Sequence, residues 1–295
     1  MSTAPTAQPL VLDEPTWHAR RDDHRARVDS WLEGHRQRRS HGRPHPVEDF
    51  LFEYYSYRPY QLRRWHPGHG VRLTGDSAAE LADLRDYRRS SAGVSVDTAA
   101  VLSARGETVA WVHNLLRRTV GRPAQYGCFG LHEWAMVYRQ DQRRLRHPQL
   151  PLRFPPERVA AIVEERGVRC THFDAYRFFT EPARPLNLLP LTRQGQPEVE
   201  QPGCLHANMD LYKWAYKLSP LTPSELVADC FALAREIREL DMRASPYDLT
   251  SLGYAPVAVE TAEGRAVYVA AQRVFADRAE PLRRALLRLT DELLG

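Results

Sequence analysis

Apolar residues recur every three or four positions over long stretches of the chain, which is the spacing of one buried face of an α-helix. The pattern predicts helices over residues 14–39, 47–56, 77–89, 98–120, 131–140, 156–166, 206–218, 223–243 and 266–294. Strand patterns are confined to residues 71–74 and 168–179, with a hairpin near 260–264. We therefore expect a mainly α fold, with compact helical domain(s) and a few short β-strands.

Prolines concentrate in residues 148–156, which favours a linker at that point. The balance of charge changes there as well, because most arginine clusters lie before it. These changes predict a flexible N-terminal tail over residues 1–13, a basic helical half over 14–147, and a helical half over 157–295 that carries the candidate active-site segments. The same pattern is compatible with a single domain that contains both halves.

Length and composition exclude several classes of protein. A chain of 295 residues with 43% hydrophobic and 26% charged residues is long and apolar enough to bury a core. No uncharged apolar run approaches the roughly 18 residues of a membrane span. The N-terminus lacks the basic and then apolar pattern of a signal peptide. The four cysteines lie far apart, which argues against a disulfide scaffold and predicts a soluble protein in the reducing cytoplasm.

Arginine clusters in the N-terminal part of the chain carry much of the positive charge. The formal net charge is +4 at pH 7. The clusters comprise Arg20, Arg21, Arg25 and Arg27, followed by Arg36, Arg38, Arg39 and Arg43. Such clusters can neutralise the phosphates of double-stranded DNA. The alternative is a solvated helical face, because Asp22, Asp23 and Asp29 interrupt the run. No membrane partner is expected, and no particular oligomeric state is predicted.

Lysine is almost absent from the sequence. All but two of the 41 basic residues are arginine, and Lys213 and Lys217 lie four positions apart in the predicted helix 206–218. That spacing places both lysines on one side of the helix. A lysine ammonium is compact and changes its pKa readily on burial, which a guanidinium does not. We therefore expect a specific role for at least one of them.

Three segments share the order cysteine, histidine, carboxylate. They comprise Cys128, His132 and Glu133; Cys170, His172 and Asp174; and Cys204, His206 and Asp210. Such residues suit either acid–base catalysis or metal binding. The sequence contains no Cys-x-x-Cys, His-Glu-x-x-His or Asp-x-Asp motif, so neither a metal nor a cofactor is expected.

The second and third of these segments define a candidate catalytic site. Strand alternation over residues 168–179 places His172, Asp174 and Tyr176 on one face, with Asp174 as the essential acid and His172 orienting it. A helix that begins near His206 brings His206 and Asp210 together at positions i and i+4, and Lys213 continues that side. The predicted catalytic residues are Asp174, His172, Glu133, His206, Asp210 and Lys213.

Aromatic residues crowd the stretch from residue 50 to residue 65, with arginines interleaved. This mixture is typical of proteins that stack on nucleic-acid bases. It is equally typical of a helical core with one exposed, arginine-rich edge. The predicted substrate-binding residues are Tyr54, Tyr55, Arg58, Trp65, Tyr176, Arg177 and Lys217.

Four stretches, 45–55, 63–68, 171–179 and 206–217, resemble a family of actinobacterial proteins named 3-methyladenine DNA glycosylase. The resemblance spans nearly the whole chain. It implies an enzyme that hydrolyses the N-glycosidic bond of alkylated purines, with a carboxylate as acid or base, an aromatic slot for the extruded base and a basic surface for DNA. The hairpin motif of helix-hairpin-helix glycosylases has its nearest match at residues 66–70, where a predicted strand follows, so that fold is not expected.

Two alternatives stay open at this point. One is a small-molecule enzyme on a helical bundle, namely a hydrolase, a lyase or a metal-dependent oxygenase. It would use as bases or ligands His132, Glu133, His172, Asp174 and His206. The other is a binding domain without catalysis, in which these side chains form structural ion pairs.

Overall fold

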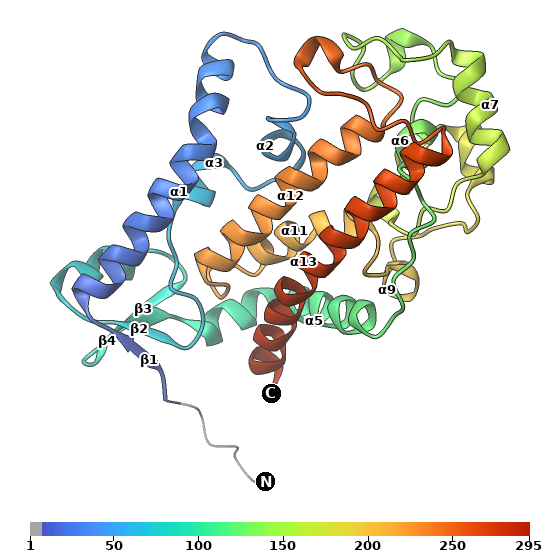
Figure 1. Cartoon of the computed structure of the whole chain (residues 1–295). Helices are drawn as coiled ribbons and strands as arrows, with labels where there is room; N and C mark the ends of the chain where they lie inside the picture. The colour runs from blue at the N-terminus through green and yellow to red at the C-terminus, as the bar shows by residue number, and fades with distance from the viewer. Residues whose placement is uncertain (1–7) are drawn as a thin grey trace.

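The structure, a computed structural model, describes residues 8–295 and is built mainly from α-helices (Figure 1). Helices account for 59% of the chain and strands for 6%, which confirms the predicted fold class. Among residues 8–295, no helix combines the length and the apolar character needed to cross a membrane.

Four long helices form the frame of the molecule, and the apolar spacing predicts each of them. They are α1 (Glu14–Ser40), α5 (Thr98–Val120), α12 (Ser224–Ala244) and α13 (Ala262–Leu294). The side chains of Asp13, Asp97 and Thr261 accept hydrogen bonds from backbone N–H groups in the first turns of α1, α5 and α13. The hairpin predicted near 260–264 is wrong, because Thr261 caps α13 and the helix begins at Ala262.

Shorter helices fill the space between the long ones. They are α2 (Phe50–Tyr54), α3 (Pro59–Arg63), α4 (Ala79–Ala82), α6 (Leu131–Ala135), α7 (Pro156–Arg166), α8 (Phe173–Tyr176), α9 (Gln196–Val199), α10 (Leu205–Met209) and α11 (Leu211–Lys217). Short 3₁₀-helices lie at Asp76–Ala78, Gln142–Arg144, Glu181–Leu186 and Thr250–Leu252. The helix predicted over 206–218 is divided at Asp210, which ends α10 and precedes α11.

A small sheet lies beside the N-terminal end of α1 (Figure 1). Its strands are β1 (Leu10–Leu12), β2 (Val71–Leu73), β3 (Tyr87–Ser90) and β4 (Gly93–Val96), in the order β1-β2-β4-β3. β1 runs parallel to β2, with Val11 opposite Arg72, whereas the other neighbouring strands are antiparallel. Of the two predicted strands, 71–74 is therefore confirmed.

The sheet overturns two predictions. Residues 10–12 were assigned to the flexible tail, yet they form β1 and bury Leu12 against the core; residues 1–7 of that tail lie outside the described residues. The helix predicted over 77–89 ends early, because β3 pairs with β4. Gly93 permits this pairing: its φ is 128°, and a Cβ there would lie 2.3 Å from the Leu73 carbonyl oxygen.

The long helices pack on one another across the proline-rich stretch. α13 contacts α5 and α12, and α10 and α11 pack against α12 and α13. α1 contacts α12, and α12 and α13 run through the middle of the view in Figure 1. One hydrophobic cluster includes Trp17, Trp134 and Phe231, and therefore draws on residues before and after the stretch 148–156.

The strand predicted over 168–179 is wrong. Val168 forms a single bridge to Asn187, and the chain then turns into the short helix α8. His172 stabilises this turn, because its Nδ1 accepts a hydrogen bond from the Ala175 N–H at 3.3 Å and caps the helix. The alternation argument for His172 and Asp174 therefore fails, and tertiary contacts decide where these side chains lie.

Candidate functional site

A cavity of about 580 Å³ opens where residues of α2, α5, α8 and α11 meet. Its volume lies within the range of about 300–1,000 Å³ that is usual for small-molecule sites. The cavity wall includes six of the residues predicted to be catalytic or substrate-binding, namely Tyr54, Tyr55, Asp174, Arg177, Lys213 and Lys217. Residues that lie far apart in the chain therefore line one concave surface.

Lys213 lies in the cavity wall between two aspartates. Its ammonium donates a hydrogen bond to Asp174 at 2.7 Å and another to Asp210. The other oxygen of Asp174 accepts a hydrogen bond from Arg193 at 2.5 Å, and the guanidinium of Arg177 lies 3.4 Å from that oxygen. Asp174 therefore holds three cations beside the cavity.

Asp210 is held from two further directions. The Tyr55 hydroxyl donates a hydrogen bond to one oxygen at 2.7 Å, and His172 Nε2 lies 3.1 Å from the other. Both Asp210 and His172 are buried. We refer to His172, Asp174, Asp210 and Lys213 as the cavity cluster.

These contacts set the charges of the cavity cluster. Burial raises the pKa of Asp174, but Lys213 more than offsets this and holds that pKa below its ordinary value. The pKa of Asp210 is likewise raised by burial, and Lys213 and His172 lower it further than burial raises it. Burial lowers the pKa of Lys213, whereas the two aspartates raise it above the ordinary value of lysine. At neutral pH the cluster therefore holds an ammonium between two carboxylates.

The cavity wall carries more positive than negative charge. Its cations are Arg177, Arg193, Lys213 and Lys217, and its acids are Glu107 and Asp174. The side chains of Arg177 and Arg193 are 47% and 45% exposed, so both can contact a ligand while they pair with Asp174. Lys217 is exposed and forms no ion pair within residues 8–295. The surplus favours a ligand that contains an anionic group.

Aromatic side chains supply the apolar part of the wall. Tyr54, Trp111, Trp214 and Tyr216 all line the cavity. The ring centroids of Trp111 and Trp214 lie 4.9 Å apart, with the ring planes inclined at 52°. Flat apolar surfaces of this kind suit a ligand that contains an aromatic ring system.

A second cavity, of about 450 Å³, adjoins the first. The two cavities share Ser56, Tyr216 and Lys217 in their walls. The second is also lined by Arg64 and Arg85, so the basic lining continues beyond the first cavity. A ligand with more than one anionic group can therefore extend from one cavity into the other.

Three predicted substrate-binding residues lie elsewhere. Trp65 is buried, its ring stacks on Trp17 with 6.3 Å between centroids, and its indole N–H donates to Glu225 at 3.1 Å. Arg58 precedes α3, away from the cavity wall, and Tyr176 packs against the hydrophobic core. Core packing therefore accounts for part of the aromatic density, because rings such as that of Trp65 fill the space between helices.

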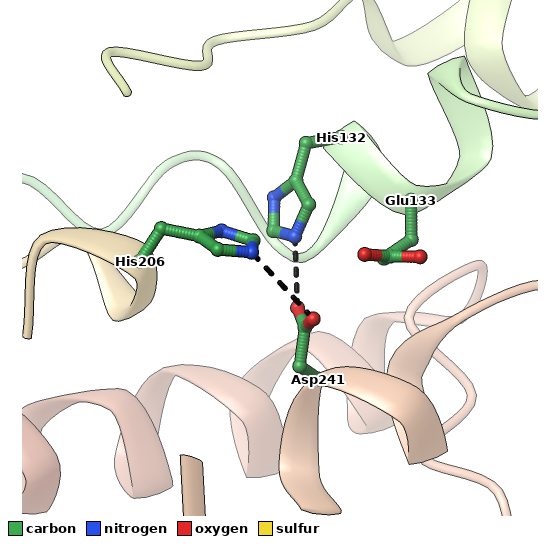
Figure 2. A group of neighbouring side chains, drawn as sticks. All are labelled: His132, Glu133, His206 and Asp241. Carbon is green, nitrogen blue, oxygen red and sulfur yellow. Dashed lines mark hydrogen bonds and ion pairs between the residues drawn. The ribbon is translucent and has the colours of Figure 1, made fainter. Parts of the chain in front are cut away.

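Glu133 and His206 lie away from the cavity. With His132 and Asp241 they form a buried group that we call the closed cluster (Figure 2). The Nε2 atoms of His132 and His206 lie 2.8 Å and 3.8 Å from the Asp241 carboxylate. The imidazole of His206 thus faces Asp241 and not Asp210 as predicted, although the Asp210 N–H donates to the His206 carbonyl at 2.8 Å. The Asp210 carboxylate instead contacts Tyr55, His172 and Lys213.

The sequence patterns do not identify every residue of the cavity wall and of the closed cluster. Arg193 lies in an irregular segment where no spacing marks it, and Trp111 follows the apolar spacing of α5 that is typical of core residues. The position of Asp241 in the sequence, in contrast, does indicate a buried polar contact. It stands three residues after Arg238 on the buried face of α12, and charged residues on a buried face indicate a polar contact inside the protein.

Most arginines of the predicted DNA surface are paired with acids. The ion pairs are Arg20–Glu225, Arg27–Asp229, Arg36–Asp29 and Arg38–Asp49. Within the part of the chain that the structure describes, Arg39 and Arg43 have no such partner. A smaller basic surface than the sequence predicts is therefore free to contact phosphates.

The chain matches no family model, and no curated protein or solved structure is detectably similar to it. Functional arguments for this protein therefore rest on the geometry and chemistry of its own residues.

Proposed function

We propose that this protein is an enzyme that hydrolyses the N-glycosidic bond of an alkylated purine in DNA, the reaction implied by the resemblance in its sequence. The observation that supports the proposal is the ionised carboxylate of Asp174 in the wall of a cavity with aromatic walls and surplus cations. These features suit the charge that develops on the sugar, the purine ring and the phosphates.

The chemistry needs an anion more than a proton donor. Departure of the base leaves positive charge on the sugar ring, as in glycoside hydrolysis. An alkylated purine is already cationic and leaves without being protonated, so a carboxylate close to the sugar is the required group. Asp174 suits this role, because its pKa is low and Lys213 and Arg193 hold it in place.

The remaining cavity residues suit the other parts of the substrate. Tyr54 and Tyr216 would stack on the extruded base, and their π-faces attract its positive charge. Lys217 and Arg177 would bind the flanking phosphates. Arg39 and Arg43, which line a separate hollow, would contact other phosphates of the duplex. All four cysteines are free, which supports a reducing compartment such as the cytoplasm.

The test is base release from methylated duplex DNA. We expect the wild type to release 3-methyladenine and Asp174→Asn to release it about 100-fold or more slowly, the usual cost of removing one electrostatic contact to a transition state. Asp229→Asn is the matched control, because among residues 8–295 Asp229 pairs only with the exposed Arg27, and it lies outside the cavity. Absence of release by the folded wild type would overturn the proposal.

A separate measurement tests DNA as the partner. Arg39→Glu combined with Arg43→Glu should weaken binding to duplex DNA and flatten its dependence on salt, because each lost phosphate contact reduces the salt slope by about one. Unchanged affinity and salt slope would exclude this surface from DNA binding.

One observation favours a second candidate function. The cavity wall holds four cations against two acids, which attracts an anion more readily than a cationic base. The second candidate is therefore a hydrolase or lyase for an anionic aromatic small molecule, such as a nucleotide. Protection of the wild type against thermal unfolding by nucleoside monophosphates, without base release from DNA, would favour this candidate over the first.

A further inference from the structure

The closed cluster brings together four side chains from three helices. His132 and Glu133 lie on α6, His206 on α10 and Asp241 on α12. One nitrogen or oxygen atom from each of the four lies within 4.8 Å of those of the other three, and all four residues are buried. Figure 2 shows the two imidazoles directed at the Asp241 carboxylate, with Glu133 beside them.

Two of these side chains have no hydrogen bond to another residue that the structure describes. Within residues 8–295, neither the His206 imidazole nor the Glu133 carboxylate has a hydrogen-bond partner, although the residues are only 8% and 7% exposed. The nearest oppositely charged groups are the Asp241 carboxylate, 3.8 Å from His206, and Arg238, 3.7 Å from Glu133. The lone pairs of both groups are therefore available to a ligand that lies among the four side chains.

Contacts outside the cluster orient one of the two imidazoles. His132 Nδ1 lies 3.3 Å from Cys128 Sγ, which leaves Nε2 to face the centre of the cluster. An outer contact of this kind on the second ring nitrogen orients ligand histidines in metal sites.

We propose that His132, Glu133, His206 and Asp241 bind one divalent transition-metal ion, with zinc as the expected ion. Two imidazoles and two carboxylates are ligands that zinc accepts, and four protein ligands make a closed, structural site. None of the four lines the cavity, so the ion would join α6, α10 and α12 and take no part in the reaction. This inference does not depend on the proposed function, and it replaces the sequence-level expectation that no metal is bound.

The competing arrangement is an ion-pair cluster without a metal. In that case His132 Nε2 donates a hydrogen bond to the Asp241 carboxylate at 2.8 Å. Arg238 lies 3.3 Å from Asp241 and would balance the second carboxylate. This arrangement gives His206 and Glu133 no hydrogen bond within residues 8–295, whereas a metal ion would bind both side chains.

The experiment measures metal content and metal-dependent stability. Full-length protein is produced with trace zinc, purified without a nickel column or chelator, and analysed for all transition metals. We expect about one zinc ion per chain. After removal of the metal, zinc should raise the thermal unfolding midpoint, and cobalt should give the visible absorption bands of a four-coordinate site.

Two variants identify the ligands. His206→Gln should reduce the bound metal at least tenfold, whereas His172→Gln should retain it, because His172 stacks on His206 at 5.4 Å but lies outside the ligand set. The cobalt spectrum of the wild type serves if His206→Gln does not fold. The proposal is overturned if the wild type contains no transition metal and neither zinc nor cobalt binds to it, or if His172→Gln loses the metal while His206→Gln keeps it.

Discussion

The cavity cluster and the closed cluster are neighbours with opposite character. One member of each, His172 and His206, stack with 5.4 Å between ring centroids and 21° between planes. In the cavity cluster each aspartate contacts the Lys213 ammonium, and Asp174 also holds two half-exposed arginines. In the closed cluster two buried side chains have no hydrogen bond within residues 8–295.

This difference shows which groups balance the buried charges of each cluster. The cavity cluster is balanced by its own cations, and its outermost groups can exchange a protein contact for water or for a ligand. Among the described residues, the closed cluster has no half-exposed cation of this kind, because its neighbouring Arg238 is itself buried, so its charges need partners inside the protein. The first arrangement suits binding and chemistry, and the second suits a structural ion.

The largest effect is expected from Asp241→Ala in the closed cluster. This change leaves the buried Arg238 without its nearest carboxylate and removes the contact to His132. Breaking a buried charge pair costs about 3–5 kcal/mol, to be measured by urea denaturation. Asp229→Ala, which breaks an exposed pair with Arg27, should cost about 0–1 kcal/mol. A loss below about 1 kcal/mol for Asp241→Ala would contradict the comparison.

A smaller loss is expected from Asp174→Ala in the cavity cluster. Arg177 and Arg193 are about half exposed and can turn to water when the carboxylate is removed, while Lys213 keeps Asp210. The expected cost is about 1–2 kcal/mol, measured in the same way. If Asp174→Ala costs as much as Asp241→Ala, the exposed arginines do not compensate for the lost carboxylate by turning to water.

The pH dependence of stability tests whether the neighbouring cations hold Asp174 in its ionised form. The pKa of Asp174 is lower in the folded protein than in the unfolded chain, where it is about 3.9. The stabilisation from Asp174 is therefore fully present above that value and is lost as the pH falls through the lower folded pKa. Between pH 7 and pH 3, urea midpoints should fall less steeply for Asp174→Asn than for the wild type. Identical slopes would mean that Asp174 is not held by its cations.

The smallest effect on stability is expected from Lys217→Ala. Lys217 is exposed in the shared wall of the two cavities, so its removal should change the free energy of unfolding by no more than about 0.5 kcal/mol. Affinity for an anionic ligand or DNA should nevertheless fall, with a salt slope lower by about one. Loss of stability without loss of affinity would assign Lys217 to the fold and not to ligand binding.

The sequence predicted part of the site for reasons that the structure revises. Asp174 and Lys213 were selected separately, one by strand alternation and one by the rarity of lysine, and they form a hydrogen bond of 2.7 Å. The alternation itself was wrong, because a side-chain cap at His172 outweighs the apolar pattern of a strand. Glu133 and His206 were placed in the same site, but they belong to the closed cluster.

Local interactions explain what the sequence determined by itself. The long helices α1, α5, α12 and α13 follow from apolar spacing and from caps such as Asp13 and Thr261, which act within a few residues. The strand at 71–74 and the mainly α class follow from similarly short patterns. None of these features requires knowledge of which helices meet.

Only the tertiary structure decided the two clusters. Tyr55 and Asp210 are 155 residues apart in sequence, and His132 and Asp241 are 109 apart, yet each pair is in hydrogen-bond contact. No local spacing specifies such a contact, because it depends on how α2, α6 and α12 pack around a shared core. That packing decides whether a buried charge has a partner. It therefore also decides how the cavity cluster differs from the closed cluster.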